Sequence, residues 1–178
     1  GMGGGSITII PQGKKMQGAY HAAGNAILYG ATGGQLFISG RVGQRFGVRN
    51  SGAIAVVEGC SAHAAEYMTG GTLVILGEIG FNFAAGMTGG KVIVLNTQKS
   101  FDQYISESAP SSHDLNEIDS LDLKTLLEKH VSQTGSELAT KLLSKEDAWH
   151  KIFTVFGGIA EISDKKQISL KNKISALD

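Results

Sequence analysis

A glycine-containing motif recurs along the first half of the chain at a nearly constant interval. Four segments carry it, TGGQLFISG, NSGAIAVVEG, TGGTLVILG and TGGKVIVLN, which begin at Thr32, Asn50, Thr69 and Thr88. Successive copies lie 18, 19 and 19 residues apart, measured between the glycines two residues after each start, namely Gly34, Gly52, Gly71 and Gly90. A fixed period near 19 residues indicates a repeat architecture, in which each copy is one structural unit stacked on its neighbours.

The apolar runs of these repeats predict strands. Of the 25 glycines in the chain, 22 lie in residues 1–97, and each interior glycine costs a helix ~1 kcal/mol relative to alanine. The runs are short, mainly β-branched and nearly continuous, which is typical of parallel strands. Parallel strands normally need a helical crossover, and no helical pattern separates these runs. We therefore predict an all-β solenoid over residues 2–97, a single-stranded parallel β-helix with strands at 7–10, 53–57, 72–76 and 91–95.

Aligning the repeats on their glycines predicts which side chains share a column of the solenoid. Two apolar columns are expected to fill the interior: Leu36, Ile54, Leu73 and Val92 in one, and Ile38, Val56, Ile75 and Val94 in the other. A mostly polar column is expected to face outward and comprises Gln35, Ala53, Thr72 and Lys91. A hydrogen-bonded ladder is expected from the residues that start the repeats, Thr32, Asn50, Thr69 and Thr88. The glycines are expected at sharp corners, where any side chain would clash, or would be strained by a positive φ.

The composition changes after the repeats. Residues 98–118 are polar and serine-rich, which predicts a linker, and residues 119–178 form a predicted helical C-terminal tail. Helices are expected over 119–132 and 136–143, and a third from Asp147 onward that ends at Gly157. Its apolar residues are expected to pack on the flank of the β-helix: Trp149, Ile152, Phe153 and Phe156.

Charge and cysteine content exclude several classes of partner. The 16 Lys and Arg residues balance the 16 Asp and Glu residues, which gives no basis for binding nucleic acid or an anionic membrane. The apolar runs fall short of the ~18 residues that span a membrane. One cysteine, Cys60, excludes a disulfide within the chain and suits a reducing compartment. We predict a cytoplasmic protein.

Few residues suggest chemistry. The segment 86–92, GMTGGKV, resembles a phosphate-binding loop, but one residue is missing between its glycines and a strand follows it. Cys60 has His63 three residues away and is either a nucleophile or a small apolar filler. The five histidines show no metal-ligand spacing. We expect no catalytic, cofactor-binding or metal-binding residue in this chain.

Three arginines recur every four residues, at Arg41, Arg45 and Arg49. The glycines between them argue against a helix, so they are expected at successive corners. Two of them are expected to pair with Glu58 and Glu66, and the alternative is that all three face a partner domain.

The segments GRVGQRFGVRNSGAIAVVEG, EYMTGG and NFAAGMTGGKVIVLN resemble the C-terminal glycine-repeat (GXGXG) domain of the glutamate synthase large subunit. The similarity continues through FDQ at 101–103, residues 126–143 and the region of Trp149. It implies a right-handed parallel β-helix without catalytic residues, which supports and spaces a glutaminase domain and an FMN-binding domain. It also implies that FMN and an iron–sulfur cluster are held in those partner domains and none in this chain.

Three alternative functions stay open on the sequence. A related β-helix is a subunit of formylmethanofuran dehydrogenase, so the chain could scaffold a complex of that kind. It could also be a stand-alone β-helix that self-associates through an open N-terminal end, because uncovered coil ends expose strand edges and core. A third hypothesis, from the enzyme class, is a small hydrolase or transferase that uses Cys60 and His63.

Overall fold

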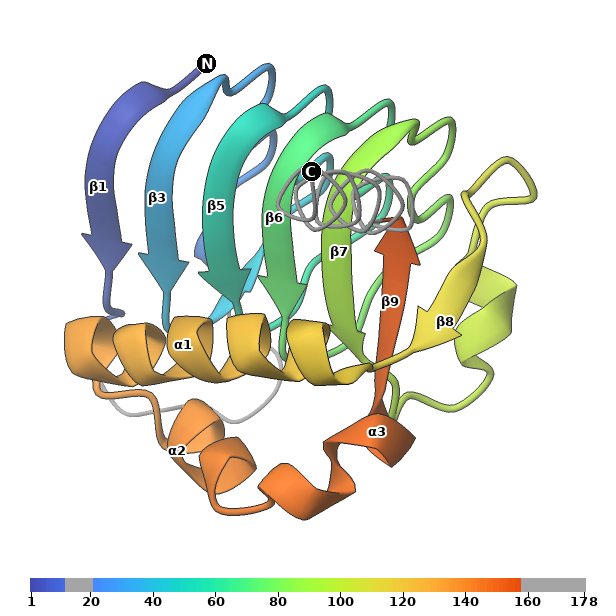
Figure 1. Cartoon of the computed structure of the whole chain (residues 1–178). Coiled ribbons are helices and arrows are strands. Elements are labelled where there is room, and N and C mark those ends of the chain that lie inside the picture. Colours follow the sequence, from blue (N-terminus) through green and yellow to red (C-terminus); the bar gives the residue numbers. More distant parts are fainter. Residues whose placement is uncertain (12–20, 158–178) are drawn as a thin grey trace, which may run out of the picture.

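The computed structural model describes residues 1–11 and 21–157, and the lysine-rich end after Ser163 lies outside them. The chain winds as a right-handed β-solenoid of stacked parallel coils (Figure 1), which confirms the predicted fold class. One strand of each coil joins a large sheet, in the order β1-β3-β5-β6-β7-β9-β8 among the described residues. Its parallel strands are β1 (Gly3–Ile9), β3 (Gly33–Ile38), β5 (Ser51–Val57), β6 (Thr69–Ile75) and β7 (Gly89–Leu95). A second, small parallel sheet pairs β2 (His21–Ala23) with β4 (Arg41–Val42).

In the second repeat, one residue more than in its neighbours separates the repeat start from the paired part of the strand, which shifts the predicted columns. Ile54 pairs with Gln35 and Thr72, so Ala53 is an extra residue after Gly52. The buried Asn50 satisfies the backbone of Ala53: its Oδ1 accepts from the N–H at 2.9 Å and its Nδ2 donates to the carbonyl at 3.0 Å.

Three predictions are therefore wrong. The interior positions assigned to Ile54 and Val56 belong to Ala55 and Val57, and the outward position assigned to Ala53 belongs to Ile54. The predicted ladder is also wrong, because Asn50 is buried and bonds within its own coil. The other three members of that ladder are exposed, namely Thr32, Thr69 and Thr88.

The four repeat glycines lie where backbone segments meet closely. Gly71 has a φ of 84°, and a Cβ there would lie 2.3 Å from the carbonyl oxygen of Ala53. Gly52 would place its Cβ 2.3 Å from the carbonyl oxygen of Thr32. The left-handed region is also occupied by Gly34 and Gly90. Neighbouring coils can therefore stack only where these positions lack a side chain.

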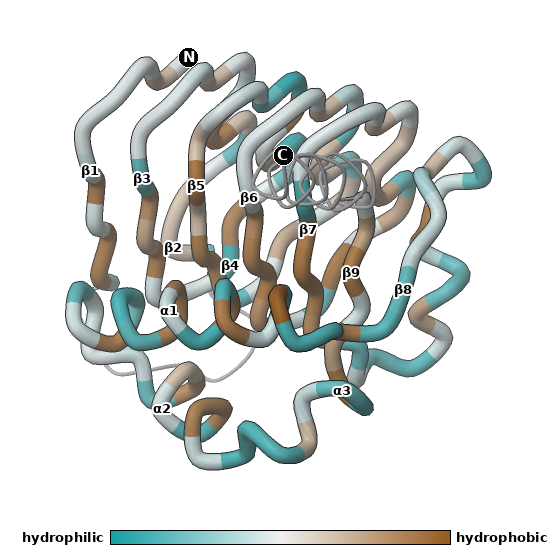
Figure 2. The backbone as a smooth tube through the Cα atoms, viewed as in Figure 1, coloured by the Kyte–Doolittle hydropathy of each residue, from teal (hydrophilic) through white to brown (hydrophobic). Residues whose placement is uncertain are grey.

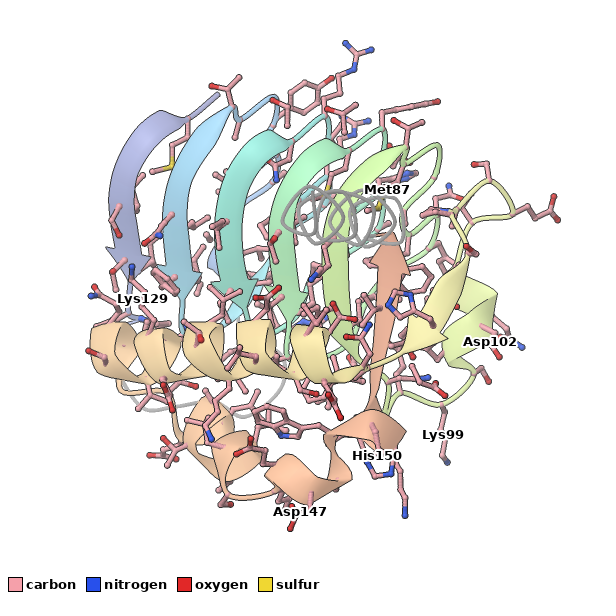
Figure 3. The ribbon with its side chains drawn as sticks, in the orientation of Figure 1. Met87, Lys99, Asp102, Lys129, Asp147 and His150 are labelled. Atoms are coloured by element: carbon pink, nitrogen blue, oxygen red, sulfur yellow. The ribbon has the colours of Figure 1, made fainter. Side chains whose placement is uncertain are left out.

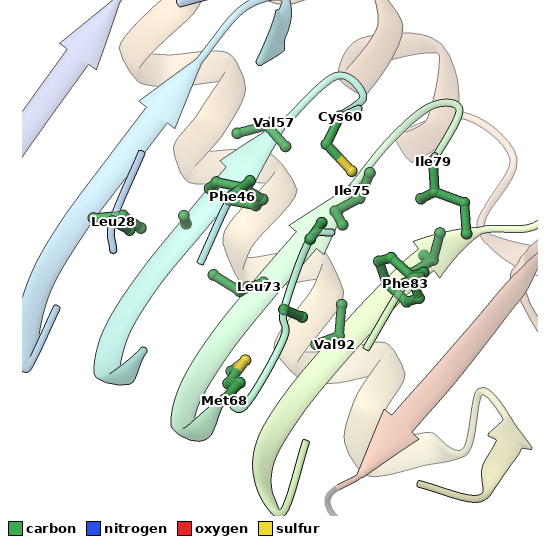
Figure 4. Close-up of a cluster of buried hydrophobic side chains, with 14 of the residues drawn as sticks. Leu28, Phe46, Val57, Cys60, Met68, Leu73, Ile75, Ile79, Phe83 and Val92 are labelled. Atoms are coloured by element: carbon green, nitrogen blue, oxygen red, sulfur yellow. The ribbon is translucent and has the colours of Figure 1, made fainter. Parts of the chain in front are cut away.

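Alternating side chains of the large sheet fill two separate cores. The inner core lies within the coils (Figure 4) and contains Leu36, Ala55, Leu73 and Val92 together with Ile38, Val57, Ile75 and Val94. The outer core lies between the sheet and the helices and contains Phe37, Val56, Val74 and Ile93. The apolar halves of the strands are brown in Figure 2, and the glycine-rich halves are pale. Since side chains alternate between the two faces of a strand, a strand apolar on both faces has near-continuous apolar sequence.

Helix α1 (Glu117–Thr134) crosses the outer face of the large sheet and runs from the side of β7 toward the side of β1 (Figure 1). Its first two turns lie beside β7, where the Nζ of Lys91 is 2.8 Å from Asp122. Farther along, Lys129 donates to Gln35 of β3 (Figure 3), and Gln133 accepts from Thr8 of β1 at 3.1 Å. α1 begins after the Asn116 cap and ends at Gly135, which has a φ of 67°.

The remaining C-terminal elements close the solenoid. They are η1 (Phe101–Tyr104), β8 (Ser112–Asp114), α2 (Glu137–Leu143), η2 (Glu146–Ala148), α3 (Trp149–Ile152) and β9 (Phe153–Gly157). β9 pairs antiparallel with β7 on one side and with β8 on the other. The range predicted as a linker therefore contains η1 and β8.

The prediction that a third helix continues to Gly157 is wrong. The helix ends at Ile152, and Phe153–Gly157 is a strand. Phe153 and Val155 point into the outer core, whereas Phe156 points into the inner core, which is the alternation of a strand. β-branched and aromatic residues favour strands, and the open edge of β7 supplies the partner.

Candidate functional site

The most unusual backbone lies at the corner of each coil that follows the small sheet. Residues with a positive φ alternate there with residues whose φ is negative. They number three in each of the four described corners: Ala26, Leu28 and Gly30; Arg45, Gly47 and Arg49; His63, Ala65 and Tyr67; Asn82, Ala84 and Gly86. A non-glycine residue in this region costs roughly 1–2 kcal/mol. We call these residues the left-handed corner.

Backbone hydrogen bonds in both directions fix the left-handed corner. The N–H of Arg45 donates to Ala62 of the next coil at 2.9 Å, and the N–H of Gly47 donates to Ile27 of the preceding coil at 2.9 Å. The N–H of Arg49 again donates forward, to the carbonyl of Glu66 at 2.9 Å. Because each coil is bonded to both neighbours, the corner is a rigid surface.

The middle residue of each triplet points inward, and the outer two face outward. The inner position is closely packed at Gly47, where a Cβ would lie 2.5 Å from Leu73. The outward positions of the two middle coils include large side chains: Arg45 and Arg49 are exposed, and Tyr67 is 57% exposed.

The structure separates the three arginines that the sequence grouped. Arg41 lies in β4, where its Nη1 is 3.0 Å from Glu78 and its Nη2 donates to the carbonyl of Cys60 at 3.2 Å. Within the described ranges, the side chains of Arg45 and Arg49 make no ion pair or hydrogen bond. The predicted pairing of two of the arginines with Glu58 and Glu66 is therefore wrong.

Cys60 and His63 do not form a nucleophilic pair. Cys60 is 0% exposed in the inner core, and burial raises the pKa of its thiol to about 12. The ring of His63 lies at the surface, and its Nδ1 is 2.7 Å from Glu66. A buried thiol that stays protonated at neutral pH cannot act as a nucleophile.

Two other candidates from the sequence fit no ligand. After Gly86 the chain enters strand β7 at Gly89, so no helix N-terminus follows the 86–92 segment. Among the residues that the structure describes, no group of three or more His, Cys, Asp and Glu side chains could hold a metal ion.

A buried polar contact holds the helices to the end of β5 and was not predicted. Glu58 accepts from the hydroxyl of Ser136, and one of its oxygens lies 3.5 Å from Nε2 of His130. His130 and Ser136 are 0% and 1% exposed. Burial alone would raise the pKa of Glu58, but the nearby His130 ring and the hydrogen bond from Ser136 together lower it.

A second polar contact joins α1 to β7. The Nζ of Lys91 lies 2.7 Å from Asp119, which is 1% exposed, and 2.8 Å from Asp122. Burial alone would lower the pKa of Lys91, but the two carboxylates raise it above its ordinary value. Asp119 also lies 3.1 Å from Nε2 of His113. The only signal in the sequence was a lysine at the start of the apolar run of the strand, with two acids three residues apart in the helix.

The stacked parallel coils and the glycine corners define a β-solenoid of the glycine-repeat class. The chain belongs to the GXGXG motif family, whose profile matches residues 1–159. The ferredoxin-dependent glutamate synthase of Pyropia yezoensis is 44% identical over 152 residues, which are 84% of this chain and 10% of the relative. The glutamate synthase [NADPH] large chain of Bacillus subtilis (strain 168) is 40% identical over 163 residues, again 84% and 10%. The glutamate synthase [NADH] of Schizosaccharomyces pombe is 50% identical over 122 residues, 68% of this chain and 6% of the relative.

The chain thus spans about a tenth or less of the length of each of these three relatives. No helix in the described part of the chain combines the length and the apolar character needed to cross a membrane. The relative from Spinacia oleracea is named as chloroplastic. The cytoplasmic location stays a prediction.

Proposed function

We propose that the chain is the non-catalytic scaffold of a glutamate synthase, holding a glutaminase domain and an FMN-binding domain at a fixed spacing. The observation that carries the proposal is the match over most of the chain to relatives named as glutamate synthases. The rigid solenoid supports it, because stacked coils bonded to both neighbours keep their two ends at a constant distance.

The reactive groups of such an enzyme would be in the partner domains. Iron–sulfur clusters are held by several cysteine thiolates, and this chain has only Cys60, which is buried. The residues present therefore do not fit a cluster. We expect FMN and the iron–sulfur cluster in the partners, and no turnover of glutamine or 2-oxoglutarate by this chain alone.

A domain replacement tests the proposal. In the Bacillus subtilis large chain, the region that matches this chain is deleted in one variant and replaced by this chain in another. We expect the deletion to abolish glutamate formation from glutamine and 2-oxoglutarate, and the replacement to restore it. A replacement no more active than the deletion would contradict the scaffold role.

A second candidate function is self-association through the edge of β1. Ile7 is 47% exposed, although it occupies the column of Leu36, which is 3% exposed. Among the described strands, β1 pairs only with β3. A second copy that covers this edge would bury Ile7, so light scattering should find dimers in the native protein and monomers in the Ile7→Lys variant. A native monomer at high concentration would exclude this function.

A further inference from the structure

We propose that the left-handed corner around Arg45, Arg49 and Tyr67 is the surface on which this scaffold docks an acidic face of its catalytic partner. The inference rests on the proposed function, since it names the surface through which that function would operate. The partner is a folded protein surface with exposed carboxylates.

The first argument is that the chain keeps large side chains where the backbone disfavours them. Arg49 has a φ of 54° and Tyr67 a φ of 52°, yet the equivalent positions in the neighbouring coils are Gly30 and Gly86. Glycine is therefore compatible with this corner position, and it would relieve the strain of the left-handed backbone. Strained residues of this kind cluster at functional sites.

The second argument is charge. Arg45 and Arg49 are exposed and face outward from one rigid corner, without an ion-pair partner in the described structure. The nearby carboxylate, that of Glu66, is already occupied by His63 at 2.7 Å. Two guanidinium groups at a fixed spacing are suited to carboxylates, which they bind through paired hydrogen bonds.

The third argument is the aromatic surroundings. Tyr67 is 57% exposed on the outer side of the corner, and Tyr29, one residue before Gly30, is 44% exposed. The ring of Tyr67 lies against the next coil, because a Cβ on Gly86 would be 2.7 Å from its Cε1. A tyrosine held against the backbone loses little conformational freedom on binding. Arginine and tyrosine are also the residues that dominate binding energy at protein interfaces.

A polyanion fits the corner less well than a protein surface. Nucleic acids are bound through many phosphate contacts, and the protein's formal net charge is zero. The corner offers two arginines with aromatic residues beside them. This composition matches the centre of a protein interface, with carboxylates on the opposite side.

The same domain replacement provides the test. The variant carries Arg45→Glu and Arg49→Glu in the replaced region. The matched control carries Lys99→Glu and Lys151→Glu, an equal charge change at exposed positions near η1 and in α3. We expect glutamine-dependent glutamate formation to fall at least about tenfold in the variant and to stay within about twofold in the control. Thermal unfolding of the isolated chain should be the same for all three proteins, since these side chains are exposed.

Each outcome decides one question. An active replacement whose activity survives the arginine reversal overturns the docking surface and leaves the scaffold role intact. An equal loss in the lysine control also overturns it, because the effect would then follow net charge rather than position. A replacement that is inactive without any substitution overturns the scaffold role and, with it, this inference.

Discussion

The hydroxyl of Ser136 donates a hydrogen bond to the carboxylate of Glu58, which lies 78 residues earlier in the sequence. The same hydroxyl accepts from the N–H of Ala139 at 3.0 Å and so caps α2. One buried side chain thus starts a helix and holds that helix to the end of β5. The helical appendage and the solenoid are joined at this point by a polar contact as well as by the outer core.

Replacing Ser136 by alanine should lower the free energy of unfolding by about 2 kcal/mol, because it removes a helix cap and one partner of a buried carboxylate. Urea unfolding followed by circular dichroism measures the change. Ser144→Ala is the control, since the exposed hydroxyl of Ser144 donates only to Lys141. In a double-mutant cycle, Glu58→Gln should make the effect of Ser136→Ala smaller. Strictly additive effects would show that the two residues do not interact.

Acid should weaken the same contact. The folded-state pKa of Glu58 lies below its ordinary value of 4.5, because the nearby His130 ring and the hydrogen bond from Ser136 outweigh burial. The stability that Glu58 contributes is therefore present above pH 4.5 and is lost as the pH falls through the folded-state pKa. The difference in unfolding free energy between the native protein and Glu58→Gln should shrink between about pH 6 and pH 3. A constant difference over that range would contradict this assignment.

Alanine substitutions at two glycines should distinguish the cost of backbone strain from the cost of a steric clash. Gly71 has a φ of 84° and the carbonyl of Ala53 within 2.3 Å of a Cβ position, whereas Gly135 has a φ of 67° and nothing within 4 Å. Gly135→Ala should cost about 1 kcal/mol from the left-handed backbone alone. Gly71→Ala should cost at least about 3 kcal/mol, since the coils must move apart. Thermal unfolding compares the two, and equal shifts in Tm would show that close approach does not matter.

The thiol of Cys60 should report global unfolding. It is 0% exposed and its pKa is raised to about 12, so an aromatic disulfide reagent should leave it unmodified in the native protein. Labelling should become fast in urea, with a midpoint that coincides with the loss of circular dichroism. Fast labelling without denaturant would mean that the inner core opens locally.

The repeat period was enough to predict the solenoid, because glycine spacing and apolar runs are local features of the sequence. The register of β5 was not predictable in this way. Ala53 is accommodated only because the buried amide of Asn50 satisfies its backbone, and an alignment on glycines treats Asn50 as one more repeat start. A single extra residue then exchanges the two faces of the strand.

Long-range strand pairing explains why the predicted third helix was wrong. The run from Phe153 to Phe156 follows a helix and has helical spacing, and only the free edge of β7 makes it a strand. For the candidate site, residue type and spacing pointed to the arginines. The left-handed backbone at Arg45 and Arg49 was hidden, since sequence patterns associate a positive φ with glycine.

The length of α1 sets how many strands of the large sheet the helix can cover. Its contacts extend from Asp122 beside Lys91 in β7 to Gln133 beside Thr8 in β1. Each added strand widens a sheet by about 4.8 Å, which corresponds to roughly three residues of helix and nearly one turn. A duplicated repeat would therefore leave one strand without its helical cover unless α1 gained a turn as well. Repeat number and helix length must change together in relatives that keep this arrangement.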